Sequence, residues 1–349
     1  HAQGGSQNNN SFSTRFILKE REMNDKKSVA IFACGGAGTN LANQIEDYTP
    51  TEGFADPLIY YVDTSTSNLR RTNIDMSRVY LFDGVDGSGK ERSENSQVIA
   101  KHAQNILLQF QPTTFNIIVC SASGGSGAVI GHTLAAELRK RGEQVVMVAV
   151  GTTGSVKEIE NTIKSLKSLD GLASKIDKPM VVHYLQNSAT APRPVIDQAA
   201  KQALVYLLGL FSGQNKELDT ADLKNWLNHP ELDAQVVSLQ FTSSDPASYA
   251  HAGDVISVAT LATPEMNTLL DPVPAYQAVG FVPSSWLEGK VKLIDKEPIH
   301  YTISPNLIED VVSDLTKKLH ASQSRLTSRV RRDSLVSNTD NATGDGMVL

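Results

Sequence analysis

Short apolar runs alternate with stretches of helical periodicity through the first half of the chain. Continuous apolar runs separated by amphipathic helices are typical of a parallel sheet with both faces covered. In such sheets ligands bind beyond the carboxyl ends of the strands, so function should be sought in the loops that leave those ends. We expect strands at Val29–Cys34, Leu58–Val62, Val79–Phe82, Asn116–Cys120, Gln144–Val150 and Pro179–Leu185.

The pattern changes after a long apolar segment, Val195–Phe211. A helix that is apolar nearly all round is buried, and we expect this one to lie between two domains. An amphipathic helix is predicted from Leu307 to about Arg331. Between the two helices, strands of a smaller mixed sheet are predicted at Ala234–Thr242, Asp254–Thr263, Ala275–Val282 and Ile299–Ile303.

The predicted fold class is therefore α/β, and 349 residues suffice for two domains. Residues 1–22 are rich in Gly, Ser and Asn and precede Met23, so we interpret them as an expression leader, with a natural flexible arm as the alternative. The other divisions are a parallel-sheet domain at 23–194, a central helix at 195–212, a second domain at 213–305, a C-terminal helix at 306–332 and a flexible tail at 333–349.

Composition narrows the class of protein. The chain is 40% hydrophobic and 20% charged, as ordinary globular proteins are, and its formal net charge of −6 argues against direct nucleic-acid binding. No apolar run approaches the roughly 18 residues of a membrane span, and no signal-peptide pattern opens the chain. Cys34 and Cys120 each end an apolar run, so we expect reduced core thiols in a cytosolic protein.

Small residues follow the first two strands. Glycines let backbone N–H groups approach phosphate oxygens, and the helix that follows adds favourable partial charge. The first loop could equally be part of the GxGxxG motif of dinucleotide-binding proteins, although Leu41 stands in place of the third glycine of that motif. An acid after the second strand can bind a ribose hydroxyl or cap a helix. The residues concerned are Gly35, Gly36, Ala37, Gly38, Thr39 and Asn40, then Asp63 and Thr64.

The third predicted strand leads into GVDGSGKE at 84–91, which nearly matches the P-loop pattern. Glu91 stands where that motif places a hydroxyl for magnesium, so we do not interpret it as a Walker motif. A flexible glycine loop that closes over a terminal phosphate is our interpretation, and a plain surface turn is the alternative. Its residues are Gly87, Ser88, Gly89 and Lys90.

The loop after the fourth strand is the most informative. Its successive small residues leave a backbone able to wrap around a phosphate chain, and a helix predicted at Val129–Arg141 follows it. The hydroxyls of Ser123 and Ser126 can add donors. The phosphate-binding residues predicted here are Ser123, Gly124, Gly125, Ser126 and Gly127.

The segment SASGGSGAVIG at 121–131 resembles the glycine-rich signature of the tubulin/FtsZ superfamily, and most of all its form in the phage tubulins. The resemblance extends from Ser28 to Leu349 and includes the terminal GDGMVL. Ser123 stands where the family usually has glycine, and Ala128 stands where it has serine or glycine. Ser123 fits its position if its backbone avoids positive φ.

The resemblance implies a GTP- and GDP-binding site with Mg²⁺ on the phosphates. It assigns guanine recognition to Asn187, after the sixth strand, and Asp197, at the start of the long helix. An amide can donate to O6, and a carboxylate can accept from N1–H and the exocyclic amine. Asp197 is alternatively a favourable charge at a helix N-terminus. The magnesium ligands are unknown.

Asp219 and Asp222 follow the long helix and can share one face of a helical turn. They resemble the catalytic loop of the family, so we assign Asp222 to polarise the attacking water and Asp219 as its partner, with helix capping by Asp219 as the alternative. The long helix spans about 25 Å, which keeps these acids from phosphates held by their own chain. They can reach the nucleotide of the next subunit if subunits stack head to tail, and repetition of that contact gives a filament.

The C-terminal region suits a second contact between subunits. In phage tubulins the tail docks on a neighbouring subunit, and opposite charges on helix and tail would favour such docking. A solvated, disordered end is the alternative. The polymer-contact residues predicted are Arg325, Arg329, Arg331, Arg332, Asp345, Met347, Val348 and Leu349.

The resemblance thus implies an assembly-dependent GTPase that forms cytoskeletal filaments in the cytoplasm of an infected bacterium and positions phage DNA there. We expect the chain to associate with further copies of itself and not with a membrane. Its cargo is unknown. Two other functions stay open: a nucleotide-binding filament protein without hydrolysis, and an NAD-dependent oxidoreductase, which the first glycine loop and Asp63 would suit.

Overall fold

A computed structural model describes residues 27–45, 53–69, 74–82, 96–215, 217–242, 254–282, 294, 296–305 and 307–340. Its framework is one sheet with the strand order β3-β2-β1-β4-β5-β6-β7-β10-β8-β9. From β3 to β7 all neighbours run parallel, β10 is antiparallel to both β7 and β8, and β9 is parallel to β8. All ten predicted strands are confirmed, and none of their ends differs from the prediction by more than three residues. Their bounds are Ser28–Cys34, Asp56–Asp63, Val79–Leu81, Phe115–Ser121, Gln144–Thr152, Met180–Asn187, Val236–Thr242, Ser257–Ala262, Tyr276–Phe281 and Ile299–Ser304 for β1 to β10.

The strands predicted for the smaller second domain continue the sheet of the first half. Met180–Val182 of β6 pair in parallel with Val236–Ser238 of β7. This pairing satisfies backbone groups that would otherwise form an open edge of the parallel sheet. The two halves therefore share one continuous framework.

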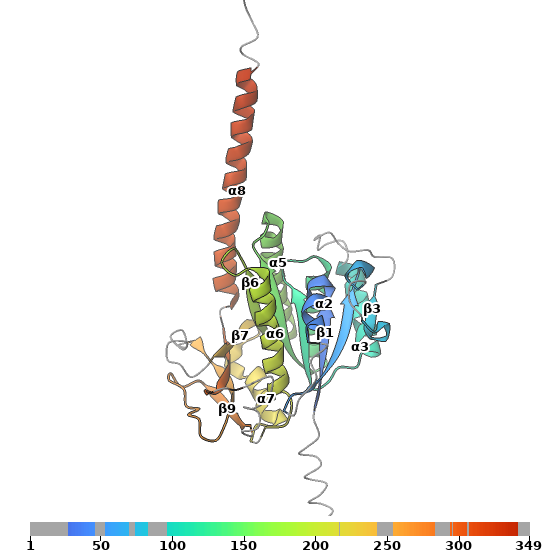
Figure 1. Cartoon of the computed structure of the whole chain (residues 1–349), viewed down its shortest axis with the longest axis vertical. Coiled ribbons are helices and arrows are strands. Elements are labelled where there is room, and N and C mark those ends of the chain that lie inside the picture. Colours follow the sequence, from blue (N-terminus) through green and yellow to red (C-terminus); the bar gives the residue numbers. More distant parts are fainter. Residues whose placement is uncertain are drawn as a thin grey trace, which may run out of the picture.

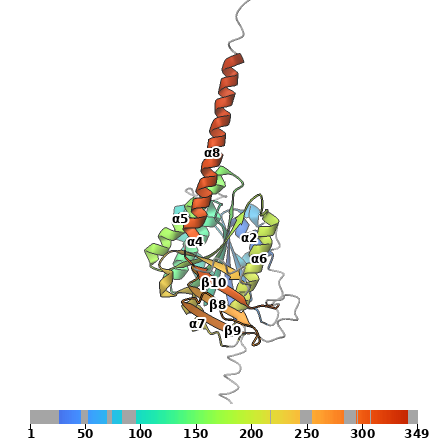
Figure 2. The same cartoon turned by 90° about the vertical axis from the view of Figure 1, so that its left-hand side faces the viewer.

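Helices cover both faces of the sheet, as the apolar strands predict. One face packs against α2 (Gly35–Asn43), α6 (Arg193–Leu210) and α7 (Thr220–Leu227). The other packs against α3 (Ser96–Gln109), α4 (Ser126–Lys140), α5 (Val156–Ile176) and the start of α8. Along β1, Val29, Ile31 and Ala33 face the first layer, and the residues between them face the second. Figure 2 shows α2 and α6 on one side and α4 and α5 on the other.

The long helix α6 runs from the carboxyl ends of the parallel strands to their amino ends. It starts after the carboxyl end of β6, where Val195 is 56% exposed, and its second half is buried. At its far end the carbonyl oxygen of Leu208 accepts from the Ala55 N–H at 2.9 Å, just before β2. The following helix α7 therefore lies at the amino edge of the parallel strands, opposite the loops that leave their carboxyl ends (Figure 1).

Helix α8 runs from Leu307 to Asp340, so it ends well beyond the predicted end near Arg331, and the predicted flexible tail begins within it. Leu307 and Leu315 are buried against the body, whereas Leu326 is 51% exposed. The apolar pattern stops where the helix leaves the body, and the helix itself continues (Figures 1 and 2). In the part of the chain that the structure describes, none of the helices has the length and apolar character needed to cross a membrane.

Candidate functional site

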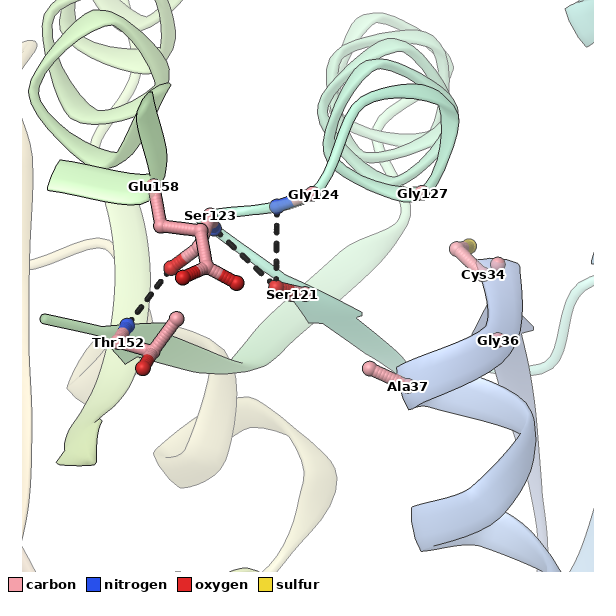
Figure 3. A pocket seen from close by; sticks show the side chains of 10 residues that line it. Cys34, Gly36, Ala37, Ser121, Ser123, Gly124, Gly127, Thr152 and Glu158 are labelled. Atoms are coloured by element: carbon pink, nitrogen blue, oxygen red, sulfur yellow. Dashed lines mark hydrogen bonds between the residues drawn. The ribbon is translucent and has the colours of Figure 1, made fainter. Parts of the chain in front are cut away.

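A cavity of about 180 Å³ opens at the carboxyl edge of the sheet, between the loops that follow β1 and β4. Its position is the one expected for a ligand site in a parallel sheet. The lining residues belong to β1, α2, β4 and the loop after it, α4, β5 and α5, and Figure 3 shows how they lie. The lining residues are Cys34, Gly35, Gly36, Ala37, Ser121, Ser123, Gly124, Gly127, Thr152 and Glu158.

Glycines allow the two loops to touch through their backbones. A Cβ on Gly35, which has a φ of +70°, would lie 2.7 Å from the Cα of Gly127. A Cβ on Gly127 would lie 2.8 Å from the carbonyl oxygen of Cys34. Because neither position has room for a side chain, both glycines are needed to form this corner of the cavity.

Two helix N-termini meet at the cavity. Helix α2 begins at Gly35 and α4 begins at Ser126, so unpaired N–H groups and both helix dipoles favour an anion there. Among the residues that the structure describes, no lysine or arginine lines the cavity. A phosphate chain bound here would be held mainly by backbone N–H groups.

Ser121, which our sequence analysis did not select, organises the loop after β4. Its Oγ accepts the backbone N–H groups of Ser123 and Gly124, each at 3.1 Å. It therefore fixes the direction of two backbone N–H groups of the loop, both of which point at its own oxygen. The signal that identifies it is a hydroxyl on the last residue of the strand, directly before the small residues.

The Ser123 hydroxyl does not serve the cavity as predicted. It is 2% exposed and accepts the Thr152 N–H at 2.7 Å. It lies 2.9 Å from Thr162 Oγ1, and Thr162 in turn donates to the carbonyl oxygen of Glu158. Ser123 is not among the residues with positive φ, so the serine fits without strain. Its side chain fastens the loop to β5 and α5, and its backbone is held as well, because the N–H donates to Ser121 Oγ and the carbonyl oxygen accepts from Asn161 Nδ2 at 3.1 Å.

Glu158 is a second residue that sequence reasoning missed. It lies in the first turn of α5, where Ser155 Oγ donates to its Oε2 at 2.8 Å, and it reaches into the cavity in Figure 3. Its carboxylate can accept from ligand hydroxyl groups or from water around a cation. No cluster of three or more His, Cys, Asp and Glu side chains suited to a metal occurs within the described ranges.

The Asp63 carboxylate is held within its own loop, and the residue that caps the short 3-10 turn at Thr66–Asn68 is Ser65. Its side chain is 2% exposed and accepts from the Thr64 N–H at 2.7 Å, the Ser65 N–H at 3.1 Å and Asn68 Nδ2 at 2.8 Å. Burial raises the pKa of this carboxyl group, which the three hydrogen bonds oppose. Thr64 Oγ1 donates to Ser126 Oγ at 3.0 Å. Asp63 and Thr64 thus brace the loop and do not line the cavity.

Asn187 and Asp197 are outside the lining of the cavity, and Asn187 lies next to it. Asn187 pairs in register with Thr152, which does line it. Asp197 is in the second turn of α6, with its carboxylate 3.4 Å from Arg193 Nε. Both side chains are half-buried. The remaining predicted residues of these loops, Gly38, Thr39, Asn40, Gly125 and Ser126, lie in or just before α2 and α4 without lining the cavity.

Asp219 and Asp222 form a capping box at the start of α7. Asp219 Oδ1 accepts from the N–H groups of Ala221 and Asp222, at 2.7 and 2.9 Å, and Asp222 Oδ2 accepts from the Asp219 N–H at 3.1 Å. These hydrogen bonds hold the pKa of Asp219 below its usual value. The pair lies at the edge of the sheet opposite the cavity, as the length of α6 predicted (Figure 1).

Other predicted residues are placed only in part. Arg325 and Arg329 are exposed on α8. Arg331 and Arg332 belong to α8, and their side chains are not described. Residues 1–22, Gly87, Ser88, Gly89, Lys90, Asp345, Met347, Val348 and Leu349 lie outside the described residues.

Comparisons with known proteins agree on one class. No protein-family model matches the chain. A phage tubulin-like protein of Pseudomonas phage PhiPA3 is 26% identical over 328 residues, which cover 93% of this chain and 99% of that relative. A protofilament structure of TubZ from bacteriophage PhiKZ superposes with a TM-score of 0.74 at 26% identity, covering 93% of this chain and 95% of the other. The structure of the phage tubulin PhuZ with GDP has a TM-score of 0.72 at 23% identity, covering 87% and 93%.

The parallel sheet, the two glycine loops at its carboxyl edge and the helix that crosses to the opposite edge define the fold of the tubulin/FtsZ superfamily. Within that superfamily, the chain is similar over nearly its whole length to phage tubulin-like proteins.

Proposed function

We propose that this protein binds GTP and GDP at the cavity between α2 and α4, polymerises head to tail and hydrolyses GTP. The observation that carries the proposal is the separation of two sites on opposite edges of one sheet. The cavity suited to phosphate lies at the carboxyl ends of the parallel strands, and the paired acids of α7 lie at their amino ends. Stacking identical subunits brings one edge against the other.

The residues around the cavity suit a guanine nucleotide with magnesium. The loop N–H groups and helix N-termini would hold the phosphates, and Glu158 supplies a carboxylate near them. Asn187 and Asp197 would distinguish guanine from adenine by their donor and acceptor pattern. The GDP named for the PhuZ structure, whose fold this chain shares, supports the same ligand. Magnesium, held by phosphate and water oxygens, would offset the negative charge of the phosphates.

Hydrolysis would take place between two subunits. A water molecule adds to the terminal phosphorus while the bond from that phosphorus to the bridging oxygen breaks. The electron pair leaves with GDP, and the proton of the water passes to a carboxylate or to solvent. Asp222 would polarise this water and Asp219 would support it, which is the positioning that phosphoryl transfer asks of a protein.

The capping box gives one observation in favour of a second candidate function. Since Asp219 and Asp222 already stabilise their own helix, a filament protein that binds nucleotide without hydrolysing it would also need these residues. The two candidates differ only in turnover.

The proposed setting is the cytoplasm of an infected bacterium, where the filaments would position phage DNA. The filament and protofilament structures of the similar phage proteins support self-association of this chain as well. The proposed partner of each subunit is thus another copy of the same chain.

Light scattering across protein concentrations tests nucleotide-dependent assembly. We expect scattering to rise only above a threshold concentration and only with GTP or a slowly hydrolysed GTP analogue, because assembly places a new contact beside the terminal phosphate. GDP should give no increase, and ATP serves as the control for the base. Equal assembly with GDP, or with no nucleotide, would contradict the proposal.

A further inference from the structure

Lys27 is held at the same edge of the molecule as the paired acids. It directly precedes β1, and its N–H donates to the carbonyl oxygen of Ser212 at 3.2 Å. Its own carbonyl oxygen accepts the Asp56 N–H at 2.9 Å. The backbone of Lys27 is thus fixed between the end of α6 and the start of β2.

The aliphatic part of the Lys27 side chain lies on Gly213. A Cβ on Gly213 would come within 2.9 Å of Lys27 Cε and 3.0 Å of Cδ, and the φ of Gly213 is +69°. The glycine therefore provides the space in which the lysine stem lies. Contact along this stem restricts side-chain rotamers that an exposed lysine would keep.

The ammonium group of Lys27 is directed at the start of α7. Nζ donates to Thr220 Oγ1 at 2.7 Å, across 193 positions of the sequence. Burial lowers the pKa of Lys27, and the charge of nearby Asp219 opposes that effect. Thr220 is the one acceptor of this ammonium among the described residues, so two of its three N–H donors are available to water or a ligand.

The paired acids need a cation when they approach a phosphate. Two carboxylates and a triphosphate repel one another, and this repulsion grows as the contact excludes water. The described lining of the cavity supplies no lysine or arginine to offset it. Lys27 is half-buried, and its ammonium group has two further N–H donors. It lies on the same surface of the subunit as the paired acids.

We propose that Lys27 is a further catalytic residue that acts on the adjacent subunit, where its ammonium group donates to the terminal phosphate beside Asp219 and Asp222. This inference rests on the proposed head-to-tail GTPase. The ammonium would stabilise charge that develops on the phosphate oxygens in the transition state. A purely structural lysine would instead only tie β1 to α7 through Thr220.

Three variants separate these two roles: Lys27→Gln, Lys27→Arg, and Thr220→Ala, which removes the tie and keeps the cation. Lys101→Gln, at an exposed lysine of α3, is the charge-matched control. We expect Lys27→Gln to keep its GDP affinity within about twofold and to assemble with a slowly hydrolysed GTP analogue. Its kcat in the assembled state should fall by about 10- to 100-fold, as when a transition-state donor is removed. Lys27→Arg should recover most of that loss, and Thr220→Ala should cost at most about threefold.

Two results would overturn the inference. One is a kcat of assembled Lys27→Gln equal to that of Lys101→Gln. The other is an equal loss in Lys27→Gln and Thr220→Ala with no recovery in Lys27→Arg, which is the pattern of a structural tie. Absence of GTP turnover in the unaltered protein would instead defeat the proposed function, so the two failures are distinguishable.

Discussion

Replacing Asp222 with alanine is expected to abolish GTP turnover while leaving nucleotide binding and polymerisation intact. The acid lies at the edge opposite the cavity of its own chain, so its loss should not affect that cavity. We expect kcat to fall by about 100- to 10,000-fold, the range over which a positioned acid or base contributes. Phosphate release is measured under conditions in which light scattering shows complete assembly.

Asp222→Asn is the matched control for the capping box. The amide oxygen of asparagine can still accept from the Asp219 N–H, so the start of α7 keeps its cap while the negative charge is lost. Both variants should be inactive, and Asp222→Asn should unfold at the same urea concentration as the unaltered protein. Full turnover in Asp222→Asn would remove Asp222 from the catalytic role and favour the filament protein without hydrolysis.

Replacing Gly38 with alanine is expected to cost about 3 kcal/mol of unfolding free energy, the upper range for overpacking a core. A Cβ at this position would lie 2.3 Å from the carbonyl oxygen of Val119, and backbone on both sides leaves little room to relax. Urea unfolding followed by circular dichroism measures the change. Gly38 therefore sets how closely α2 packs on β4, which in turn shapes the cavity.

Gly124→Ala is the control for the Gly38 variant. Its added Cβ would lie 3.6 Å from the Ser121 side chain, an ordinary contact, and Gly124 has no positive φ. We expect its unfolding free energy to stay within about 1 kcal/mol of the unaltered protein. Equal stability of the two alanine variants would show that close packing of α2 on β4 does not depend on Gly38.

The hydrophobic pattern predicted the strands well because strands buried on both faces leave long apolar runs, as in β1 and β4. It did not predict the pairing of β6 with β7, since pairing depends on backbone edges that carry no side-chain signature. The end of α8 was misplaced for a related reason. Beyond Leu326 the helix has no surface of the body to pack on, so the apolar pattern fades while the helix continues.

The site was predicted in its location and only partly in its residues. Two glycines of each loop line the cavity because small residues allow backbone contact. The sequence pattern does not indicate the direction in which a polar side chain of these loops points. The Ser123 hydroxyl turns towards Thr152, and the Asp63 carboxylate turns towards its own loop. Ser121 and Glu158 were missed because one precedes the small residues and the other follows a strand whose loop contains only one glycine before α5.

The central claim is that acids from one molecule complete the active site of another. GTP turnover per subunit, measured while the unaltered protein is diluted through its assembly threshold, tests this claim most directly. Our account predicts that the rate per subunit falls steeply below the threshold, although each subunit still binds GTP. A rate per subunit that stays constant down to fully dispersed monomers would contradict it.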